Sequence, residues 1–275
     1  MKRIFISAFL LGHFFSLMSS NDSLKVGKKK QIYASWGYTR AWYTPSDIHF
    51  QDLSNNYHPA TGKNNYYDFT IYDAKANDRP DFNAIPDIVN LTSPQFVIRL
   101  GYYFNENTGI ELNYDHTKYV VNGYQTAHIK GQIDGVYMDK DTILDSQKFL
   151  AFEHTDGANF WMINFLKKVK IYEGGKNFKL CYVAKPGAGI VFPRTDVTLF
   201  GENLNNNWKV AGFIAGFENG LRVEFLKHGV FEFVTKGTYA NYLNAFILGA
   251  GNGKASHHFF CGQFTASIGL MFGKN

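Results

Sequence analysis

Apolar and polar residues alternate one by one along the end of the chain. Between Phe259 and Phe272 the even-numbered positions are apolar or glycine, and the odd-numbered positions are mostly small or polar. Such alternation predicts a β-strand with one apolar and one polar face. Strands of soluble domains usually run ~5–6 residues, whereas a tilted strand that crosses a bilayer needs ~9–11 and turns its apolar face to lipid. The stretch therefore favours a strand of a transmembrane barrel.

The same alternation predicts seven further strands, separated by two kinds of connection. Tight turns are expected at 105–108, 173–177 and 218–220, and long connections at 44–94, 122–147, 193–207 and 244–258. Short turns on one side of the membrane and long loops on the other are typical of outer-membrane barrels. The other expected strands cover 31–43, 95–104, 109–121, 148–172 with a bulge at Asp156-Gly157, 178–192, 208–217 and 221–239.

The predicted fold class is all-β: a closed, antiparallel, up-and-down transmembrane β-barrel with a long first extracellular loop. We favour eight strands, an even number that returns the C-terminus to the periplasm. Ten strands are the alternative, because residues 48–53 and 66–73 of the first long loop also resemble strands. They form either a hairpin above the membrane or two more strands of the wall.

The N-terminal residues predict export. Basic residues precede an apolar run from Ile4 to Met18, and small polar residues follow, which is the pattern of a secretory signal peptide. We expect a signal peptide at 1–20, a basic linker at 21–30 and the barrel at 31–275. The 26 Phe, 17 Tyr and 26 Gly suit aromatic-girdled β-structure, and a net charge of +5 does not indicate nucleic acid in an exported protein.

An eight-stranded barrel is just wide enough inside to be filled by its own side chains. The polar faces of the predicted strands carry charges of both signs, so ion pairs in the lumen can offset the cost of desolvation. Cys181 and Cys261 both face inward in this register, either as two free thiols or as a bridge across the lumen. The lumen residues expected to form ion pairs are Arg99, Glu111, Asp115, Arg222, Glu224 and Glu232.

Five short segments, at 46–50, 67–70, 77–80, 99–103 and 153–157, are also informative. With the alternating strands, they make the whole mature chain resemble the small outer-membrane β-barrel proteins of Gram-negative bacteria, and more narrowly a little-characterised group of them. The resemblance implies the fold and an outer-membrane location, and it carries no established activity.

The stretch 153–159 contains the sharpest candidate for chemistry. His154 and Asp156 lie two apart, and if Leu150 and Phe152 face lipid, this register turns both toward lipid near the outer rim. The arrangement is similar to that of lipid A deacylases, outer-membrane barrels that carry a His and a Ser two apart with an acidic residue. Only the histidine carries over, because Asp156 stands where the serine nucleophile is expected. The candidate catalytic residues are His154, Asp156, Glu153 and His116. The alternative interpretation is a set of rim residues that hydrogen-bond to loops or to lipopolysaccharide.

A second set of candidates lies in the first long loop. Carboxylates and a histidine there could bind a hard cation, but their spacing matches no metal motif. We favour an Asp78–Arg79 ion pair that pins the loop. His257 and His258 are expected to be solvated. The candidate ligand-binding residues are Asp47, His49, Asp78 and Arg79, and no metal or cofactor is predicted.

Three classes of function fit these observations. The favoured one is a non-enzymatic outer-membrane barrel with a filled polar lumen, in a structural, adhesive or small hydrophobic-ligand-binding role. The alternatives are an acyl hydrolase that modifies lipid A or phospholipid, and a narrow channel for small solutes. We expect a monomer in the bacterial outer membrane that contacts outer-membrane lipid and lipopolysaccharide, uses the barrel-assembly machinery during insertion, and binds no nucleic acid.

Overall fold

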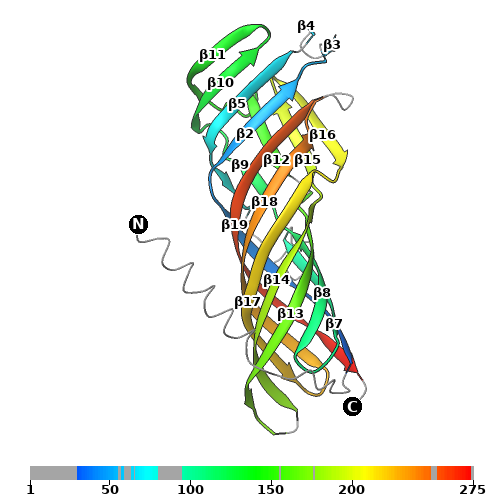
Figure 1. Ribbon diagram of the computed structural model, residues 1–275. Helices are drawn as coiled ribbons and strands as arrows, with labels where there is room; N and C mark the ends of the chain where they lie inside the picture. Colours follow the sequence, from blue (N-terminus) through cyan, green and yellow to red (C-terminus); the bar gives the residue numbers. More distant parts are fainter. Residues whose placement is uncertain are drawn as a thin grey trace.

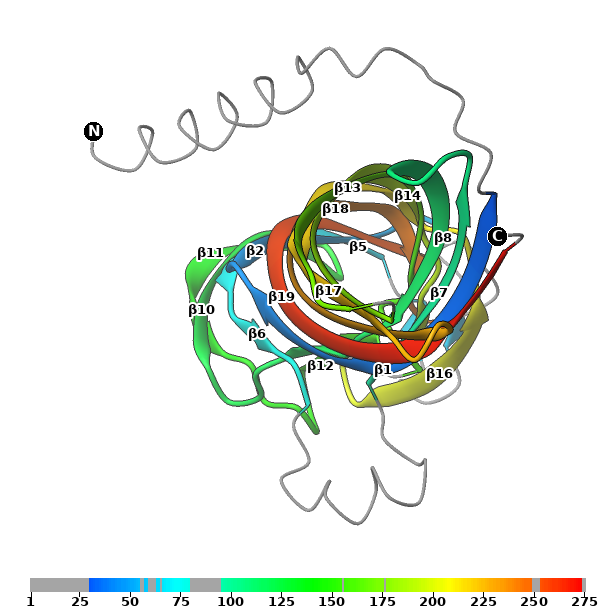
Figure 2. The ribbon, with the colours of Figure 1, turned by 90° about the horizontal axis from the view of Figure 1, so that it is seen from below.

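Eight antiparallel strands close into a ring in the computed structural model of the chain, which describes residues 30–54, 57–58, 63–64, 66–79, 95–154, 156–175, 177–248 and 253–273 (Figure 1). Each strand of the ring pairs with two others, in the order β1, β7, β8, β13, β14, β17, β18, β19 and back to β1 (Figure 2). The bounds are β1 Gln31–Tyr43, β7 Phe96–Tyr103, β8 Thr108–His116, β13 Phe160–Glu173, β14 Phe178–Val191, β17 Gly212–Phe225, β18 Gly229–Phe246 and β19 Lys254–Gly273. The predicted eight-stranded barrel is confirmed.

Two smaller sheets rise from one end of the ring, and we call them together the head. One sheet contains β2 Ser46–Asp52, β5 Tyr67–Ala74, β10 Thr126–Ile133 and β11 Val136–Ile143, and β2 joins it to the upper end of β19. The other contains β6 Ala76–Asn77, β9 Tyr119–Val121, β12 Leu150–His154, β15 Arg194–Leu199 and β16 Glu202–Trp208, and β6 joins it to β1. A short pair, β3 Tyr57–His58 and β4 Lys63–Asn64, stands apart from both.

The hairpin expected within residues 44–94 is therefore present, as β2 and β5 in the head. The other long connections also carry strands, because β10 with β11 fills 122–147 and β15 with β16 fills most of 193–207. None of the described residues forms a helix that is long and apolar enough to cross a membrane. The predicted signal peptide at 1–20 and the linker up to residue 29 lie outside the described residues.

The interior of the molecule changes character between the ring and the head. In the ring the buried side chains of β8 include Glu111 and Asp115, while Leu112 between them is exposed. In the head the alternation has the opposite sense, since Phe69 and Ile71 of β5 are buried and the polar residues of the strand face outward. The ring has the apolar-out pattern of a barrel in lipid, and the head has the apolar-in pattern of a sheet pair in water.

The two sheets of the head pack face to face through aromatic side chains. Phe50 of β2 meets Phe152 of β12 edge-on with ring centroids 5.3 Å apart, and Phe200 of the β15–β16 turn lies 5.4 Å from the ring of Tyr67. Aromatic pairs in these geometries add to the stabilisation that their buried area gives.

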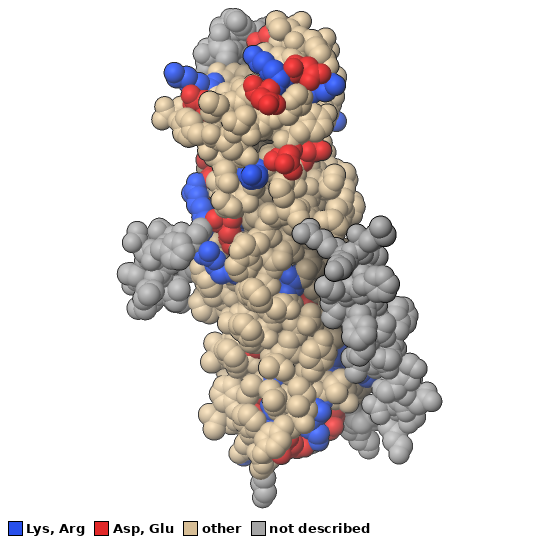
Figure 3. Space-filling view, turned by 90° about the vertical axis from the view of Figure 1, so that its left-hand side faces the viewer, with Lys and Arg blue, Asp and Glu red and all other residues tan. Residues whose placement is uncertain are grey.

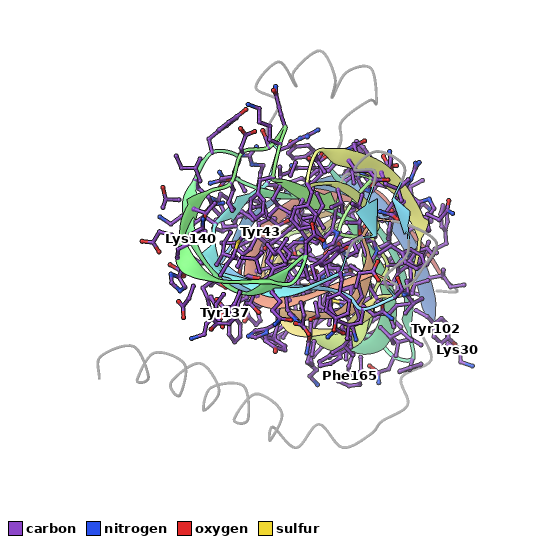
Figure 4. The ribbon with its side chains drawn as sticks, turned by 90° about the horizontal axis from the view of Figure 1, so that it is seen from above. Lys30, Tyr43, Tyr102, Tyr137, Lys140 and Phe165 are labelled. Carbon is purple, nitrogen blue, oxygen red and sulfur yellow. The ribbon has the colours of Figure 1, made fainter. Side chains whose placement is uncertain are left out.

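The outer surface follows the same division. Lys, Arg, Asp and Glu gather over the head and again at the lower end, and the surface between them is formed largely by other residues (Figure 3). Seen from above, Tyr102 and Phe165 point outward from the ring, whereas Tyr43 lies inside the molecule (Figure 4). The exposed apolar belt of the ring includes Ile32, Trp36, Ile98, Leu100, Leu112, Ile163, Phe165, Phe233, Phe264, Ile268 and Leu270.

Several boundaries differ from those predicted; the strand expected at 109–121, for example, is β8 followed by β9 in the head. Two further differences have a cause in the backbone. The strand expected at 148–172 is two strands in different parts of the molecule, β12 and β13, because Gly157 and Asn159 take positive φ values of 100° and 42° and turn the chain. The turn expected at 218–220 lies inside β17, and the actual turn follows Phe225, where Leu226 and Lys227 adopt positive φ without being glycine.

Candidate functional site

The lumen of the ring is filled by ion pairs, which we call the lumen network. Lys185 of β14 lies at its centre, with its Nζ 2.8–3.1 Å from the carboxylates of Glu111, Glu218 and Glu232. Arg99 of β7 extends the network, since its guanidinium lies 3.3 Å from Glu218. Five cations and five carboxylates take part: Arg99, Lys168, Lys185, Arg222 and Lys236 with Glu111, Asp115, Glu218, Glu224 and Glu232. All six lumen residues named from the sequence lie in this network.

The network is closed from below by aromatic and apolar side chains. The Arg222 guanidinium lies 4.1 Å from the centre of the Tyr33 ring and donates to the hydroxyl of Tyr103. Tyr33 in turn donates its hydroxyl to Glu111. Leu166, Val230 and Met271 complete this lower cluster with the two tyrosines. Buried charges are tolerated only when they are paired and hydrogen-bonded, and the equal numbers of cations and carboxylates meet that requirement.

Two histidines face each other where the ring meets the head. His154 of β12 and His257 of β19 are buried, and their Nε2 atoms lie 3.2 Å apart. The chain of contacts continues at both ends, because His154 Nδ1 lies 3.3 Å from the Thr195 hydroxyl and His257 Nδ1 lies 3.3 Å from the Ser46 hydroxyl. Tyr242 stacks on both imidazoles, with ring centroids 4.5 and 4.7 Å away.

This histidine pair is suited to bracing the structure. Its polar contacts join β2, β19, β12 and β15 across the interior. Burial lowers the pKa of His154 to about 3, because no charge near it favours the imidazolium. The neutral imidazoles then share one N–H···N hydrogen bond between them. The Ser46 hydroxyl touches a histidine, but both side chains are buried, so the contact offers no surface to a substrate.

The lipid-facing orientation considered for the candidates His154 and Asp156 is wrong. Leu150, Phe152 and His154 point into the head, because β12 lies outside the ring and its apolar face covers the apolar core of the head. Asp156 lies on the outer side and forms an ion pair of 2.5 Å with Arg194. The two side chains expected on one face are thus on opposite sides of the wall.

The other two catalytic candidates also lie away from His154. Glu153 is on the outer face of β12, where it binds Arg79 at 2.5 Å. His116 ends β8 on the outside of the ring, stacks on Phe96 with centroids 4.9 Å apart, and lies 2.9 Å from the side-chain oxygen of Asn159. The structure therefore does not bring the four candidates together.

The four candidates in the first long loop are likewise dispersed. The Asp47 side chain accepts a hydrogen bond from the backbone of Asp73, and His49 binds Asp68 at 2.6 Å on the outer face of the head. The expected Asp78–Arg79 ion pair is not formed, since Arg79 binds Glu153. In the described part of the chain, no group of three or more His, Cys, Asp or Glu could hold a metal ion.

Asp78 has a different role from the one expected. Its carboxylate is buried and accepts hydrogen bonds from the backbone N–H groups of Ala41 and Lys118 and from the side chain of Gln95. Desolvation raises the pKa of Asp78 to about 6 despite these donors. The residue ties the end of β6 to β1 and to the segment after β8.

Sequence reasoning missed three contributors to these sites. His257 was expected to be solvated, although its odd-numbered position on the last strand places it inside with Cys261. Glu218 was assigned to a turn, so its place beside Lys185 went unnoticed. Tyr242 also went unnoticed, because aromatic residues occur on both faces of β18 and do not single it out. Cys181 and Cys261 are buried, free thiols.

Similarity to known proteins is found among solved structures. No family model matches the chain, and no curated protein matches it. Among solved structures, OprG of Pseudomonas aeruginosa is 12% identical with a TM-score of 0.36, covering 90% of this chain and 98% of its own. Neisserial surface protein A is 10% identical with a TM-score of 0.33 over 88% and 97% of the two chains. The outer-membrane protease OmpT of Escherichia coli is 9% identical with a TM-score of 0.31 over 92% and 100%. At these identities, none of their activities is transferred to this chain.

Proposed function

We propose that this protein is an integral outer-membrane β-barrel that conducts no solute and holds its head outside the cell in a structural or adhesive role. The observation that carries the proposal is the lumen network, in which buried, mutually neutralising side chains occupy the space a solute would need. The belt of exposed apolar side chains around the ring supports a position in a bilayer. The expected signal peptide supports export, with insertion by the barrel-assembly machinery.

The orientation follows from the lengths of the connections. Short turns join β7 to β8, β13 to β14 and β17 to β18 at the end opposite the head. Outer-membrane barrels have short periplasmic turns and longer extracellular loops. The head therefore faces the outside, and the ends of the described chain near Lys30 and Gly273 face the periplasm.

Three observations weigh against the alternatives. A narrow channel would need an aqueous path, but the paired charges of the lumen lie directly below the apolar core of the head. An acyl hydrolase would need a nucleophile and a base that lipid can reach, but His154 is buried and Asp156 is held by Arg194. A role in binding small hydrophobic ligands is also disfavoured, because the aromatic side chains of the head fill the interior of the head.

Planar-bilayer recording tests the proposal. The purified protein should insert and show no conductance steps at either polarity, while a porin added to the same bilayer gives open-channel steps. Reproducible single-channel steps from the wild type would overturn the proposal in favour of a narrow channel.

Mass spectrometry of lipid A separates the remaining alternative. Cells that express the wild type or the His154→Ala variant should have the same lipid A profile. If lipid A loses an acyl chain only in cells that express the wild type, residues 153–159 form an active site and the proposed non-enzymatic role is wrong.

A further inference from the structure

The first sheet of the head ends in a strand that has a neighbour on one side only. Among the described strands, β11 pairs with β10 alone, and its other edge is open (Figure 1). Most residues of β11 are exposed on both faces, whereas alternate residues of β2 and β5 in the same sheet are buried. Tyr137 and Lys140 lie at the periphery of the molecule when the head is seen from above (Figure 4). An open edge of this kind offers unpaired backbone groups to an added strand.

Hydrogen bonds at the end of β11 show which of its backbone groups face the open edge. Just after the strand, the N–H of Leu144 donates to the carbonyl oxygen of Gln125, just before β10, at 2.9 Å. The backbone groups of successive residues in an antiparallel strand point to opposite sides, so the odd-numbered residues of β11 direct theirs away from β10. Tyr137, Asp139 and Asp141 therefore each present an N–H group and a carbonyl oxygen to the open edge.

The second sheet of the head has an edge of its own at β16, which is less regular. The ladder of β16 with β15 shifts register between Arg194 and Asp196, and Asn206 at this irregularity is buried. Such irregularities bend an edge strand and interrupt its pairing. The ladder of β10 with β11 runs from end to end without a shift. β11 is therefore the edge along which an added strand can align.

Two carboxylates lie along the open edge on the outer face of the sheet. Asp141 is 2.9 Å from His128 of β10, and Asp139 is 3.1 Å from Lys130 of the same strand. An ionised carboxylate has about four acceptor sites, and the side chain of Asp141 is 74% exposed. The two carboxylates can therefore accept further hydrogen bonds from cations on the side of the open edge.

The opposite face of β11 begins with apolar side chains. Val136 is exposed, and Met138 packs partly against the core of the head before Lys140 follows on the same face. Cross-strand pairs of opposite charge or of apolar side chains stabilise a sheet. The edge is thus complementary to a segment in which basic residues, placed beside Asp139 and Asp141, alternate with apolar ones.

A second copy of this chain does not fit the same edge. Two copies of β11 related by a two-fold axis would pair antiparallel with each residue on the same face of the joined sheet, so odd-numbered residues would oppose odd-numbered ones. The longest overlaps are centred on Asp139 and on Lys140. The first places Asp139 against Asp139, and the second places Asp139 against Asp141 and Lys140 against Lys140. Like charges directly opposite each other are destabilising, so these residues disfavour self-pairing.

We propose that the open edge of β11 binds an extended segment of another protein, in which basic and apolar residues alternate, as an added strand of the head. The inference deepens the adhesive role and rests on the proposed orientation of the head toward the outside. The backbone of Tyr137, Asp139 and Asp141 holds the segment, the two carboxylates pair with its basic side chains, and Val136 and Met138 contact its apolar ones.

A fluorescently labelled peptide of alternating valine and lysine is the probe. Its binding to the full-length protein in phosphatidylcholine liposomes is measured by fluorescence polarisation. Asp139→Pro removes an outward N–H without breaking the ladder to β10 and should weaken binding about tenfold or more. Asp139→Asn keeps this N–H and loses only the charge, so its loss of affinity should be smaller. The control is Glu173→Gln, which removes an exposed carboxylate at the end of β13, away from the head, and should bind like the wild type.

Hydrogen exchange in the wild type locates the bound peptide without relying on a variant that folds. The peptide should slow the exchange of the amides of Tyr137, Asp139 and Asp141, and it should leave that of Lys140, which faces β10, unchanged. Unchanged exchange at the three odd-numbered residues, or unchanged affinity in a folded Asp139→Pro variant, overturns the site.

Other outcomes test the choice of partner. Equal binding of a peptide of alternating valine and glutamate overturns the charge pattern assigned to the segment. A dimer that forms as the protein concentration rises and is lost in Asp139→Pro overturns the choice of another protein, because a second copy then occupies the edge. Bilayer recording on the same protein separates the two proposals. A silent inserted barrel that binds no peptide rejects this inference alone, and conductance steps from a protein that binds the peptide reject the proposed function alone.

Discussion

At the scale of single residues, Lys185 pairs with three buried carboxylates of the lumen. Replacing it with methionine would leave three buried carboxylates, on Glu111, Glu218 and Glu232, without their shared partner. Removing one partner from a buried ion pair typically costs ~3–5 kcal/mol. We expect Lys185→Met to lower the free energy of unfolding by about that amount in a urea titration of the folded barrel.

The matched control for this prediction is Lys140→Met. That lysine is exposed on the outermost strand of the head, so its loss should leave the urea midpoint where it is in the wild type. Equal midpoints for the Lys185 variant and the wild type would mean that the lumen network contributes little to stability.

His154 makes the stability of the head depend on pH. The pKa of His154 is about 3 in the folded protein and ~6.5 in the unfolded chain. Between these values the imidazole is protonated in the unfolded chain and neutral in the folded protein. Stability therefore falls as the pH drops below ~6.5. Between pH 6.5 and 5, the wild type should lose ~2 kcal/mol more than His154→Gln, measured by urea unfolding at both pH values.

Asp78 has the opposite effect in the same range. Its folded pKa of about 6 lies above the ordinary value, so acidification stabilises the folded state through this carboxyl group. Because both proteins retain Asp78, its contribution cancels in the comparison. If the free energy of unfolding depends on pH in the same way in the wild type and the variant, protonation of His154 does not cause the loss of stability.

At the scale of elements, the hairpin of β10 and β11 lies at the end of the head away from the ring (Figure 1). Asp134 and Gly135 form its turn, both with positive φ, as a two-residue Asp-Gly turn requires. An epitope inserted between them should be detected on intact cells, because exposed turns tolerate insertions. An epitope inserted between Gly174 and Gly175, in the turn after β13, should be detected only after permeabilisation.

If the epitope after β13 is detected on intact cells and the epitope in the head only after permeabilisation, the barrel has the opposite orientation. Detection of both epitopes on intact cells would mean that the ring does not separate two compartments.

The strands of the ring could be predicted from sequence because lipid imposes one rule on all of them. Apolar residues at every second position of a long strand must face hydrocarbon. For β1, β8 and β19 the alternation therefore predicts both the strand and which of its faces points outward. In β12 the period is the same, but the strand lies above the belt, where water replaces lipid and the apolar side turns inward. Period alone therefore placed Leu150 and His154 on a common face without indicating that this face is the inner one.

Turn chemistry explains the second error. Asn219 and Gly220 have the composition of a turn, yet they lie in β17, where Gly220 fits against the backbone of Phe233 and Val234. The real turn uses Leu226 and Lys227 at positive φ, which side chains of their kind rarely adopt. The contact of Glu218 with Lys185 on the neighbouring strand stabilises β17 through this segment. The residues next to Glu218 in the sequence do not indicate that contact.

At the scale of the whole molecule, the apolar surface has a different meaning on the ring and on the head. Ile163 in the belt is 65% exposed and Ile143 at the end of β11 is 58% exposed. Ile163→Arg should cost ~2–4 kcal/mol in liposome-inserted protein, because an arginine there faces the bilayer interior. Ile143→Arg should change the stability little, since that site faces water.

The two arginine variants are compared by urea unfolding from liposomes. Equal effects of the two substitutions would show that the belt of the ring is not in contact with lipid.

The ring and the head also share strands. β1 and β18 rise from the ring into the head, and β19 descends from the head into the ring without a loop, so that His257 and Gln263 belong to one uninterrupted strand. Along these three strands no linker separates the head from the ring, so a protease acting on whole cells that cuts the hairpin turns of the head would not release it there. A receptor or surface that pulls on the head would load those strands lengthwise, and the pull would pass directly into the wall embedded in the membrane.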